Sequence, residues 1–458
     1  MELEERLKEL IEELDRIHPE GFFDGQAWHI GDNFPDFVTA QNGHERHFTK
    51  KARAALSVIA ATIHENDKSI SLCIALGNFE KIVKQCVADL HAGGEFDVEV
   101  RGALKQIKDR SGTSLSQLKM EFTHYFPAWT LGMETERPFI LGPVTIMTRE
   151  QWIEAVDFHQ SAIDQYLSLP EENARWKESL KQALENPKDN TNLTGLAEPI
   201  YSAIQDCPSV LKITVKGYEK DLSRKVAEIV CKSALDGMSL LFGGTEFFHQ
   251  QALCNERLQP VGSDTIVETN GYLWLPGSSI GPRFRHLSYP RVRDHLADKT
   301  LFLEIFGRIL NALVDPASTK YPNLSKRWAT ALDWMAEGSR EKNDAVALAK
   351  IASSLDVLAC GGKFSGILDM LTHLTKISDS TVVVNGRKPR TLRQVVKDIY
   401  DNGRSQILHG THVDRLKSFE ESKGYAVFFA RLALIESALR LDKFTGVDGD
   451  KEFRTMPD

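Results

Sequence analysis

The last third of the chain limits the possible folds most strongly, because from Val292 onward almost every segment repeats its apolar residues at helical spacing. This repeat predicts a bundle of helices joined by short loops. A single β-like interruption is expected at Thr381–Val384, turning at Asn385-Gly386. We expect helices near residues 293–314, 323–339, 342–360, 364–377, 391–409 and 418–441.

The middle of the chain mixes strands with helices. Phe139–Thr148 is rich in β-forming residues, and Leu211–Lys216 alternates apolar and polar residues as a half-buried strand does. A helix is predicted over Leu222–Phe242, and Pro187–Thr194 is rich in turn-forming residues and predicts a loop. Asn270-Gly271, between two β-rich segments, is a strong hairpin signal.

The N-terminal part is predicted to be mainly helical. Five apolar residues there follow a heptad spacing, namely Leu3, Leu7, Leu10, Leu14 and Ile17. Two heptads are too few to hold a dimer alone, so an amphipathic helix that packs on its own domain is the simpler interpretation. The expected fold class is therefore α+β and predominantly helical. Three regions are expected: a helical region 1–137, an α+β domain 138–290 and a helical domain 291–458.

The composition excludes several classes of protein. The chain has 458 residues, 42% hydrophobic and 26% charged, which is typical of a globular protein with two or three domains. The acidic N-terminus does not resemble a signal peptide, and no apolar run is long enough to cross a bilayer. The six scattered cysteines favour a reducing, cytoplasmic location. We expect no cofactor and no metal, since His44 and His47 lack an evident third ligand.

One helix of the last third carries a candidate catalytic pair. We expect it to begin at the capping box Thr391–Gln394 and to end before Gly410. Its core-facing stripe consists of Leu392, Val395, Val396, Ile399 and Ile407. Gly403 lies in this stripe, where glycine costs about 1 kcal/mol relative to alanine, so a neighbouring helix is expected to approach closely. Arg404 and His409 lie on the two borders of the stripe.

Positive charge gathers around this pair although the net charge of the chain is −8. Between Arg387 and His409 the sequence has six basic residues against two acidic ones. A basic run of this kind is also typical of an ordinary solvated helix face. An arginine and a histidine near a helix C-terminus likewise stabilise a helix without any catalysis, by about 0.3–1 kcal/mol. The residues alone therefore leave both interpretations open.

The run from Tyr400 to Gly410 (YDNGRSQILHG) resembles the signature helix of Apea-like HEPN domains, which ends in Arg-x4-His followed by glycine. Arg327–Trp334 and Ile351–Leu358 are similar to earlier helices of that family. The resemblance covers about residues 320–441, roughly a quarter of the chain. Two upstream segments show a weaker resemblance to larger Apea-type proteins, namely His124–Trp129 and Phe139–Val144.

The resemblance implies a metal-independent endoribonuclease with Arg404 and His409 as catalytic residues. Asp356 stands where the family often has a glutamate, and Ser405 stands where other HEPN nucleases often have Asn, His or Asp. Ser405 is expected to orient His409, and Tyr400 is expected to pack at the edge of the stripe. The candidate RNA contacts are Arg387, Lys388, Arg390, Arg393, Lys397 and His412.

Five residues apart on a straight helix, the two catalytic side chains diverge by about 140°. Either the helix breaks near Leu408, or two protomers face each other, and the family implies the second arrangement, a homodimer. The implied partners are RNA, such as tRNA or mRNA, and a phage-derived or host trigger sensed by residues 1–290. The implied role is a prokaryotic anti-phage or toxin-like effector. The alternatives are a non-catalytic HEPN-fold module that binds RNA, a nucleotide or a protein, and a purely structural dimerisation domain.

Overall fold

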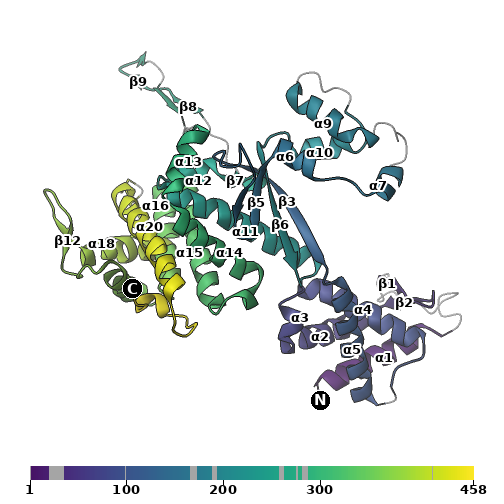
Figure 1. Cartoon of the computed structure of the whole chain (residues 1–458). Helices are drawn as coiled ribbons and strands as arrows, with labels where there is room; N and C mark the ends of the chain where they lie inside the picture. The colour runs from purple at the N-terminus through teal and green to yellow at the C-terminus, as the bar shows by residue number, and fades with distance from the viewer. Residues whose placement is uncertain are drawn as a thin grey trace. The chain divides into compact units, whose positions relative to one another are not determined.

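The structure is a computed structural model that describes residues 2–19, 36–97, 99–165, 173–187, 193–256, 262–274, 277–280, 287–414 and 416–458. The chain forms two compact units. The first comprises Met1–Phe122 with Thr214–Val226, and the second comprises Thr123–Ile213 with Ala227–Asp458. Figure 1 shows the helices and strands of both units.

The first unit is mainly helical and carries one short hairpin. Strands β1 and β2 pair antiparallel, and a side-chain cap from Thr49 starts the helix that follows them. The elements in chain order are α1 (Glu2–Ile17), β1 (Asp36–Thr39), β2 (Glu45–Phe48), α2 (Lys50–Asn66), α3 (Lys68–Ser71), α4 (Leu76–Ala92) and α5 (Val100–Leu118).

The heptad residues of α1 are buried inside the first unit. Leu7, Leu10 and Leu14 are fully buried, and they belong to one apolar core with residues of α2, α4 and α5. Helix α2 packs against α1 along this stripe. The interpretation as an amphipathic helix on its own domain is therefore confirmed, and the stripe is not open to a coiled-coil partner.

The second unit contains a five-stranded sheet with the order β4-β5-β6-β3-β7. Strand β5 pairs antiparallel with both β4 and β6, which confirms the strands predicted at Phe139–Thr148 and Leu211–Lys216. Leu211, Ile213 and Val215 are buried, as the alternating pattern predicts. The strands are β3 (Glu121–Trp129), β4 (Phe139–Leu141), β5 (Val144–Thr148), β6 (Ser209–Lys216) and β7 (Ala252–Leu253).

Helices follow the strands of this sheet and build a small core beside it. Trp152, Trp176 and Leu180 are buried together there, and a capping box at Thr148 starts α6. Most of the predicted loop at Pro187–Thr194 lies outside the described residues. The helical elements are α6 (Arg149–Ala155), α7 (Gln160–Gln165), α9 (Trp176–Glu185), α10 (Ala197–Ile204), α11 (Lys220–Phe242), α12 (Glu246–Gln250) and η2 (Cys254–Glu256).

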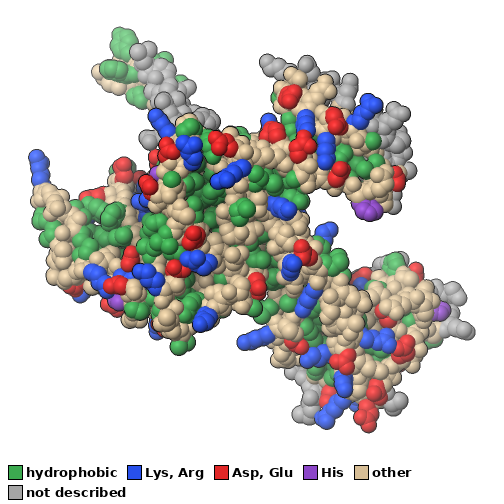
Figure 2. All heavy atoms as spheres, in the orientation of Figure 1, with side chains coloured by type: hydrophobic (Ala, Val, Ile, Leu, Met, Phe, Trp, Pro, Cys, Tyr) green, Lys and Arg blue, Asp and Glu red, His purple; other side chains and the backbone are tan. Residues whose placement is uncertain are grey.

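A β-arm extends from the second unit, and we define it as residues 262–280 with their gap at 275–276 (Figures 1 and 2). Its tip turns at Asn270-Gly271, where both residues have positive φ angles of 55° and 79°. Two positive φ angles are what a type I′ turn requires, so the predicted hairpin is confirmed. The strands are β8 (Gly262–Thr265), β9 (Glu268–Thr269), β10 (Tyr272–Leu273) and β11 (Gly277–Ile280).

The remaining residues of the second unit form the predicted helical bundle. All six expected helices are present within a few residues of their predicted ends, although the first is divided into α13 and α14. The elements are α13 (Tyr289–Ala297), α14 (Thr300–Val314), η3 (Pro316–Ser318), α15 (Pro322–Arg340), α16 (Asp344–Leu358), α17 (Lys363–Thr375), β12 (Val382–Val384), β13 (Arg390–Thr391), α18 (Leu392–Ile399), η4 (Tyr400–Ser405), α19 (Gln406–Leu408), α20 (Glu420–Lys443) and η5 (Glu452–Arg454).

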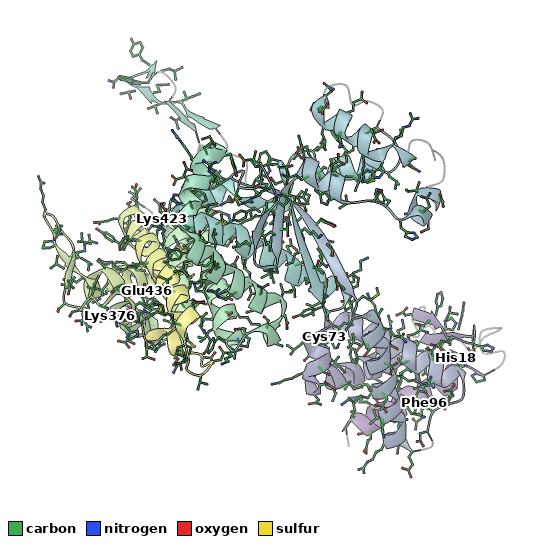
Figure 3. The ribbon with its side chains drawn as sticks, in the orientation of Figure 1. His18, Cys73, Phe96, Lys376, Lys423 and Glu436 are labelled. Atoms are coloured by element: carbon green, nitrogen blue, oxygen red, sulfur yellow. The ribbon has the colours of Figure 1, made fainter. Side chains whose placement is uncertain are left out.

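Helices α15, α16 and α20 pack against one another at the centre of this bundle. The indole N–H of Trp328 on α15 donates to the carbonyl oxygen of Leu434 on α20 at 2.8 Å. Lys423 lies near the start of α20 (Figure 3), and its Nζ lies 2.5 Å from Asp344 Oδ1 at the start of α16. The first contact joins α15 to α20, and the second joins α20 to α16.

The sheet and the helical bundle meet at two glycines of the second unit. A Cβ on Gly307 of α14 would lie 3.0 Å from the backbone nitrogen of Gly142, in the β4–β5 turn. Only residues without side chains allow this approach. The border predicted between residues 290 and 291 therefore falls inside one compact unit.

Among the described residues, no single helix is both long enough and apolar enough to cross a bilayer. Helices α16 and α17, which are joined at a bend of 69°, reach that length and hydropathy only when taken together.

Candidate functional site

The candidate site lies on α18, η4 and α19, which form one nearly continuous helix. The capping box at Thr391–Gln394 starts it as predicted, and it ends at His409, before Gly410 with its φ of 67°. A π-helical turn over Tyr400–Ser405 was not predicted. Such turns widen a helix locally and occur frequently at functional sites.

Gly403 explains how closely this helix approaches α16. Of the predicted core residues, Leu392, Val395, Val396 and Ile399 are buried together with Gly403, whereas Ile407 is only partly buried. A Cβ on Gly403 would lie 2.7 Å from Leu348 Cδ2 of α16. The predicted close approach of a neighbouring helix is therefore confirmed, and it brings Arg404 next to α16.

Arg404 is held by three side chains. Its Nε donates to Ser353 Oγ at 2.9 Å, and its Nη1 donates to Tyr400 OH at 3.1 Å. Its Nη2 lies 3.2 Å from Asp356 Oδ2, and the guanidinium carbon lies 5.2 Å from the centre of the Tyr400 ring. The Arg404 side chain retains 22% exposure. The guanidinium is therefore fixed in position but remains accessible from solvent.

Asp356 completes a charged group on the inner side of Arg404. Its side chain is 17% exposed, and its second oxygen, Oδ1, is buried with no hydrogen-bond partner among the described residues. Burial together with the negative charge of Asp356 raises the pKa of Tyr400, so the phenol remains protonated. The aspartate side chain, although shorter than that of glutamate, thus reaches Arg404.

His409 lies at the end of the same helix and is exposed. Its backbone N–H donates to the carbonyl oxygen of Ser405 at 3.0 Å. Within the described residues, no side-chain hydrogen bond joins Ser405 to His409, and none joins His409 to Arg404. One chain therefore does not bring the two predicted catalytic side chains into direct contact.

The predicted basic cluster is divided by ion pairs. Arg390 lies within 3.2 Å of Asp398 and 2.8 Å of Glu421, and Arg393 lies 2.6 Å from Asp379. These two arginines are thus neutralised within the chain. Three exposed cations have no ion pair or hydrogen bond within the described residues, namely Arg387, Lys388 and Lys397.

His412 follows the helix in the segment that leads to α20. Its ring packs edge-on against Phe419 at 4.8 Å between ring centres, and Lys417 lies 4.8 Å from the centre of the same ring. Phe419 is buried and therefore anchors this segment beside the motif. His412 is partly buried, so its candidate role as an RNA contact is restricted to one side of the ring.

Sequence reasoning missed two of the groups that hold Arg404. Tyr400 was expected to pack at the edge of the stripe, and it is buried, but its hydroxyl also accepts from Arg404. Its position four residues before Arg404 was a usable signal, because such residues are neighbours on a helix. Ser353 carried no comparable signal, since its role depends on how α16 and η4 pack.

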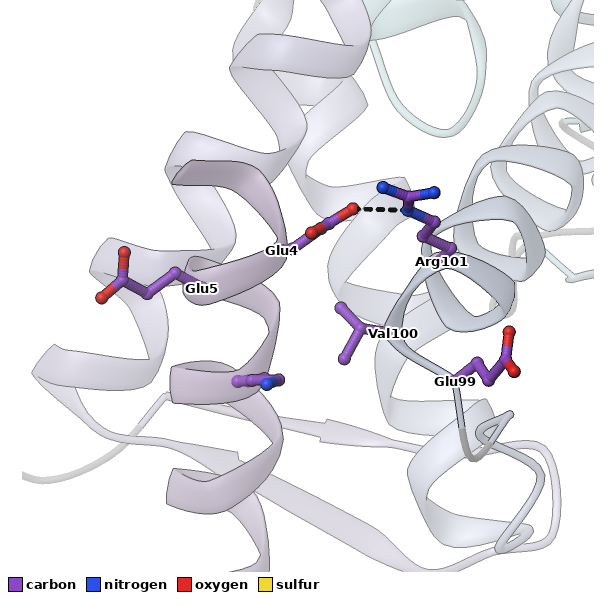
Figure 4. Close-up of a pocket in the computed structure, with 6 residues that line it drawn as sticks. Glu4, Glu5, Glu99, Val100 and Arg101 are labelled. Atoms are coloured by element: carbon purple, nitrogen blue, oxygen red, sulfur yellow. Dashed lines mark hydrogen bonds and ion pairs between the residues drawn. The ribbon is translucent and has the colours of Figure 1, made fainter. Parts of the chain in front are cut away.

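Two surface hollows lie away from this site. One, of about 580 Å³, is lined in the first unit by Glu4, Glu5, Lys8, Glu99, Val100 and Arg101 (Figure 4). Arg101 pairs there with Glu4 at 2.9 Å, and the remaining lining is largely acidic and open. The other, of about 260 Å³, lies between α14 and the ends of α15 and α20. Neither is lined by the residues around Arg404.

No group of three or more potential metal ligands is present within the described residues. His64 instead bonds the carbonyl oxygen of Ile74, and His44 is exposed. Comparison with protein-family models, with curated proteins and with solved structures gives no match.

Proposed function

We propose that the C-terminal helical domain is a HEPN-type endoribonuclease of the Apea-like kind, which cleaves RNA without a metal ion. The observation that carries the proposal is the Arg404 guanidinium, fixed by Ser353, Asp356 and Tyr400 yet partly exposed, on the helix that ends at an exposed His409. The resemblance of residues 400–410 to the family's signature helix adds to it.

The arginine has the capacity to hold a phosphate in this arrangement. A guanidinium has five N–H donors. Within the described residues two of those of Arg404 donate hydrogen bonds, and its Nη2 forms an ion pair with Asp356. Two donors thus remain for the non-bridging oxygens of a phosphodiester. Their positive charge would stabilise the additional negative charge that develops on phosphorus during cleavage.

The proposed reaction is an internal transesterification. The 2′-oxygen of a ribose loses its proton and attacks the adjacent phosphorus, and the bond from phosphorus to the 5′-oxygen breaks. The products are a 2′,3′-cyclic phosphate and a 5′-hydroxyl end, and the leaving oxygen takes up a proton. His409 suits the transfer of these protons, because an imidazole titrates near neutral pH.

The proposed site needs two copies of the chain. His409 and Arg404 do not contact each other within one protomer, so a second protomer would supply the facing side chain. On this proposal the exposed cations Arg387, Lys388 and Lys397, which form no ion pair within the described residues, would contact the RNA backbone. Residues 1–290 would sense the trigger of a prokaryotic anti-phage or toxin-like effector that acts on tRNA or mRNA.

The test is cleavage of bulk RNA in EDTA by the full chain and by the variants Arg404→Ala and His409→Ala. We expect wild type to leave cyclic-phosphate ends and each variant to lose at least about 100-fold in rate, since each removes a group that acts in the transition state. Arg293→Ala is the matched control, because this arginine is 58% exposed and lies on α13, a different helix from the motif. Equal cleavage by wild type and both variants would contradict the proposal.

One observation favours a second candidate, a non-catalytic HEPN-fold module that binds RNA, a nucleotide or a protein. All three nitrogens of Arg404 already have partners within the chain, as in an arginine that only stabilises the fold. RNA binding by wild type and by Arg404→Ala alike, with no cleavage by either, would support this module and exclude the nuclease.

A further inference from the structure

The tip of the β-arm exposes several large apolar residues next to one another. Every residue from Thr265 to Trp274 is exposed. Five of them are large apolar residues that are between 56% and 77% exposed, namely Ile266, Val267, Tyr272, Leu273 and Trp274 (Figure 2). A gathering of this kind on a soluble surface typically marks an interaction site.

The arm presents two different faces. Tyr272 pairs with Thr269 and Leu273 pairs with Glu268, and Trp274 N donates to the carbonyl oxygen of Val267 at 2.9 Å. Directly opposed residues of an antiparallel pair share a face, and neighbours along a strand alternate. The aromatic face therefore consists of Val267, Thr269, Tyr272 and Trp274, and the opposite face of Ile266, Glu268 and Leu273.

Charge decides which partner fits the aromatic face. Between Thr265 and Trp274 the one charged residue is Glu268, and it belongs to the opposite face. RNA and anionic lipid surfaces attract lysine and arginine, which this tip lacks. A face without charge can approach an identical face with no like-charge repulsion, which suits the self-complementary contact of a two-fold dimer.

We propose that the aromatic face of the β-arm packs against the same face of a second copy of this chain. The choice of a second copy rests in part on the proposed function, whose site needs two protomers. Full burial of one large aromatic side chain removes roughly 150–250 Å² from water, whereas a stable interface needs about 800 Å² per partner. The arm contact is therefore too small to hold a dimer alone, and it strengthens a dimer that other surfaces also form.

The turn makes this contact favourable by fixing the arm in advance. Asn270 and Gly271 hold the hairpin register through their positive φ angles, so little conformational entropy is lost when the faces meet. Because every residue from Thr265 to Trp274 is exposed, we expect changes at the tip to leave the folded core intact. Circular dichroism can check that this is so.

The experiment is sedimentation equilibrium of the full chain over a range of concentrations. We expect the aromatic-face variant Val267→Ser/Tyr272→Ser/Trp274→Ser to raise the dimer dissociation constant at least tenfold, because buried tyrosine and tryptophan dominate interface affinity. The matched control is the opposite-face variant Ile266→Ser/Leu273→Ser, which removes similarly exposed apolar side chains from the same arm. We expect that variant to change the constant less than about threefold.

Three results would overturn the proposal: a monomeric wild type at all concentrations, equal constants for wild type and the aromatic-face variant, or equal weakening by both variants. Co-sedimentation of wild type with phosphatidylglycerol vesicles, lost in the aromatic-face variant, would assign the tip to lipid and also overturn it. The measurement contains no RNA, so it does not depend on nuclease activity. A weaker dimer of the aromatic-face variant would therefore support the proposed arm contact even if wild type and Arg404→Ala proved equally inactive as nucleases.

Discussion

At the scale of single residues, the hydrogen bonds of His18 at the end of α1 determine its charge (Figure 3). Its Nδ1 donates to the carbonyl oxygen of Leu14 at 2.8 Å, and its Nε2 accepts the backbone N–H of His47 at 2.9 Å. A backbone N–H can only donate, so Nε2 must be unprotonated and the ring must be neutral. A second proton would break the bond to His47.

The hydrogen bonds of the neighbouring His91 likewise keep its ring neutral. Its Nδ1 accepts from Arg46 Nε at 2.8 Å, and its Nε2 donates to Asp15 Oδ1 at 3.0 Å. The rings of His18 and His91 lie 5.4 Å apart, and the nearby cation of Arg46 disfavours further positive charge. Burial lowers the pKa of His18 to about 4, and it also lowers the pKa values of His47 and His91.

The first unit should therefore lose stability in mild acid. In the unfolded chain a histidine takes up a proton near pH 6.5, but folded His18 takes one up only near pH 4. Between these values the unfolded state binds more protons, so stability falls as the pH decreases from about 6.5 towards 4. We expect His18 to account for a loss of about 1 kcal/mol at pH 5, allowing for solvent screening, and the lowered pKa values of His47 and His91 act in the same direction.

Urea unfolding at pH 7.5 and pH 5, followed by a probe in the first unit, measures this effect. The variant His18→Gln keeps a polar acceptor but cannot be protonated, so it should show a smaller difference between the two pH values. Exposed His44 is the matched control, and His44→Gln should leave the difference unchanged. A pH dependence identical in all three proteins would exclude His18 as its source.

At the scale of elements, the packing of the motif helix on α16 depends on one missing side chain. A Cβ on Gly403 would lie 2.7 Å from Leu348 Cδ2 and 2.9 Å from the carbonyl oxygen of Asp398. Because one of these atoms belongs to the backbone, relief by side-chain rotation alone is not sufficient. We expect Gly403→Ala to destabilise the second unit by about 1–3 kcal/mol, despite the better helix propensity of alanine.

Gly424 on α20 provides the matched control for this prediction. A Cβ there would meet nothing within 4 Å, so Gly424→Ala should stabilise the helix by up to about 1 kcal/mol. Thermal or urea unfolding of both variants measures the two effects. Equal effects of the two substitutions would show that helix propensity, and not the contact with Leu348, decides the result at Gly403.

The elements that the sequence predicted well are those whose signals are local. The capping box at Thr391, the Asn270-Gly271 turn and the apolar periods of the last six helices each depend on neighbouring residues, and each is confirmed. The π-helical turn at Tyr400–Ser405 was not predicted, because it arises from packing between helices that are distant in sequence. Ser353 was missed for the same reason, since it meets Arg404 across 51 positions of sequence.

At the scale of the whole molecule, the chain folds into two compact units whose composition the sequence did not predict. The first unit takes a short segment from the middle of the chain, Thr214–Val226, and α11 begins in one unit and ends in the other. Linear patterns such as periodicity locate helices and strands, but they do not report which distant segments share a core. The borders predicted at residues 137 and 290 rested on such linear patterns alone.

Two separate cores should give two unfolding transitions in calorimetry of the full chain. Leu10 is fully buried in the core of the first unit, and Leu332 is fully buried in the bundle of the second. Either leucine replaced by alanine should cost its own unit about 2–5 kcal/mol, and thus lower one transition by several degrees while leaving the other in place. A single transition that both substitutions lower equally would instead mean that the units unfold as one cooperative body. Acid should act on the transition that Leu10→Ala lowers, because His18, His47 and His91 all belong to the first unit.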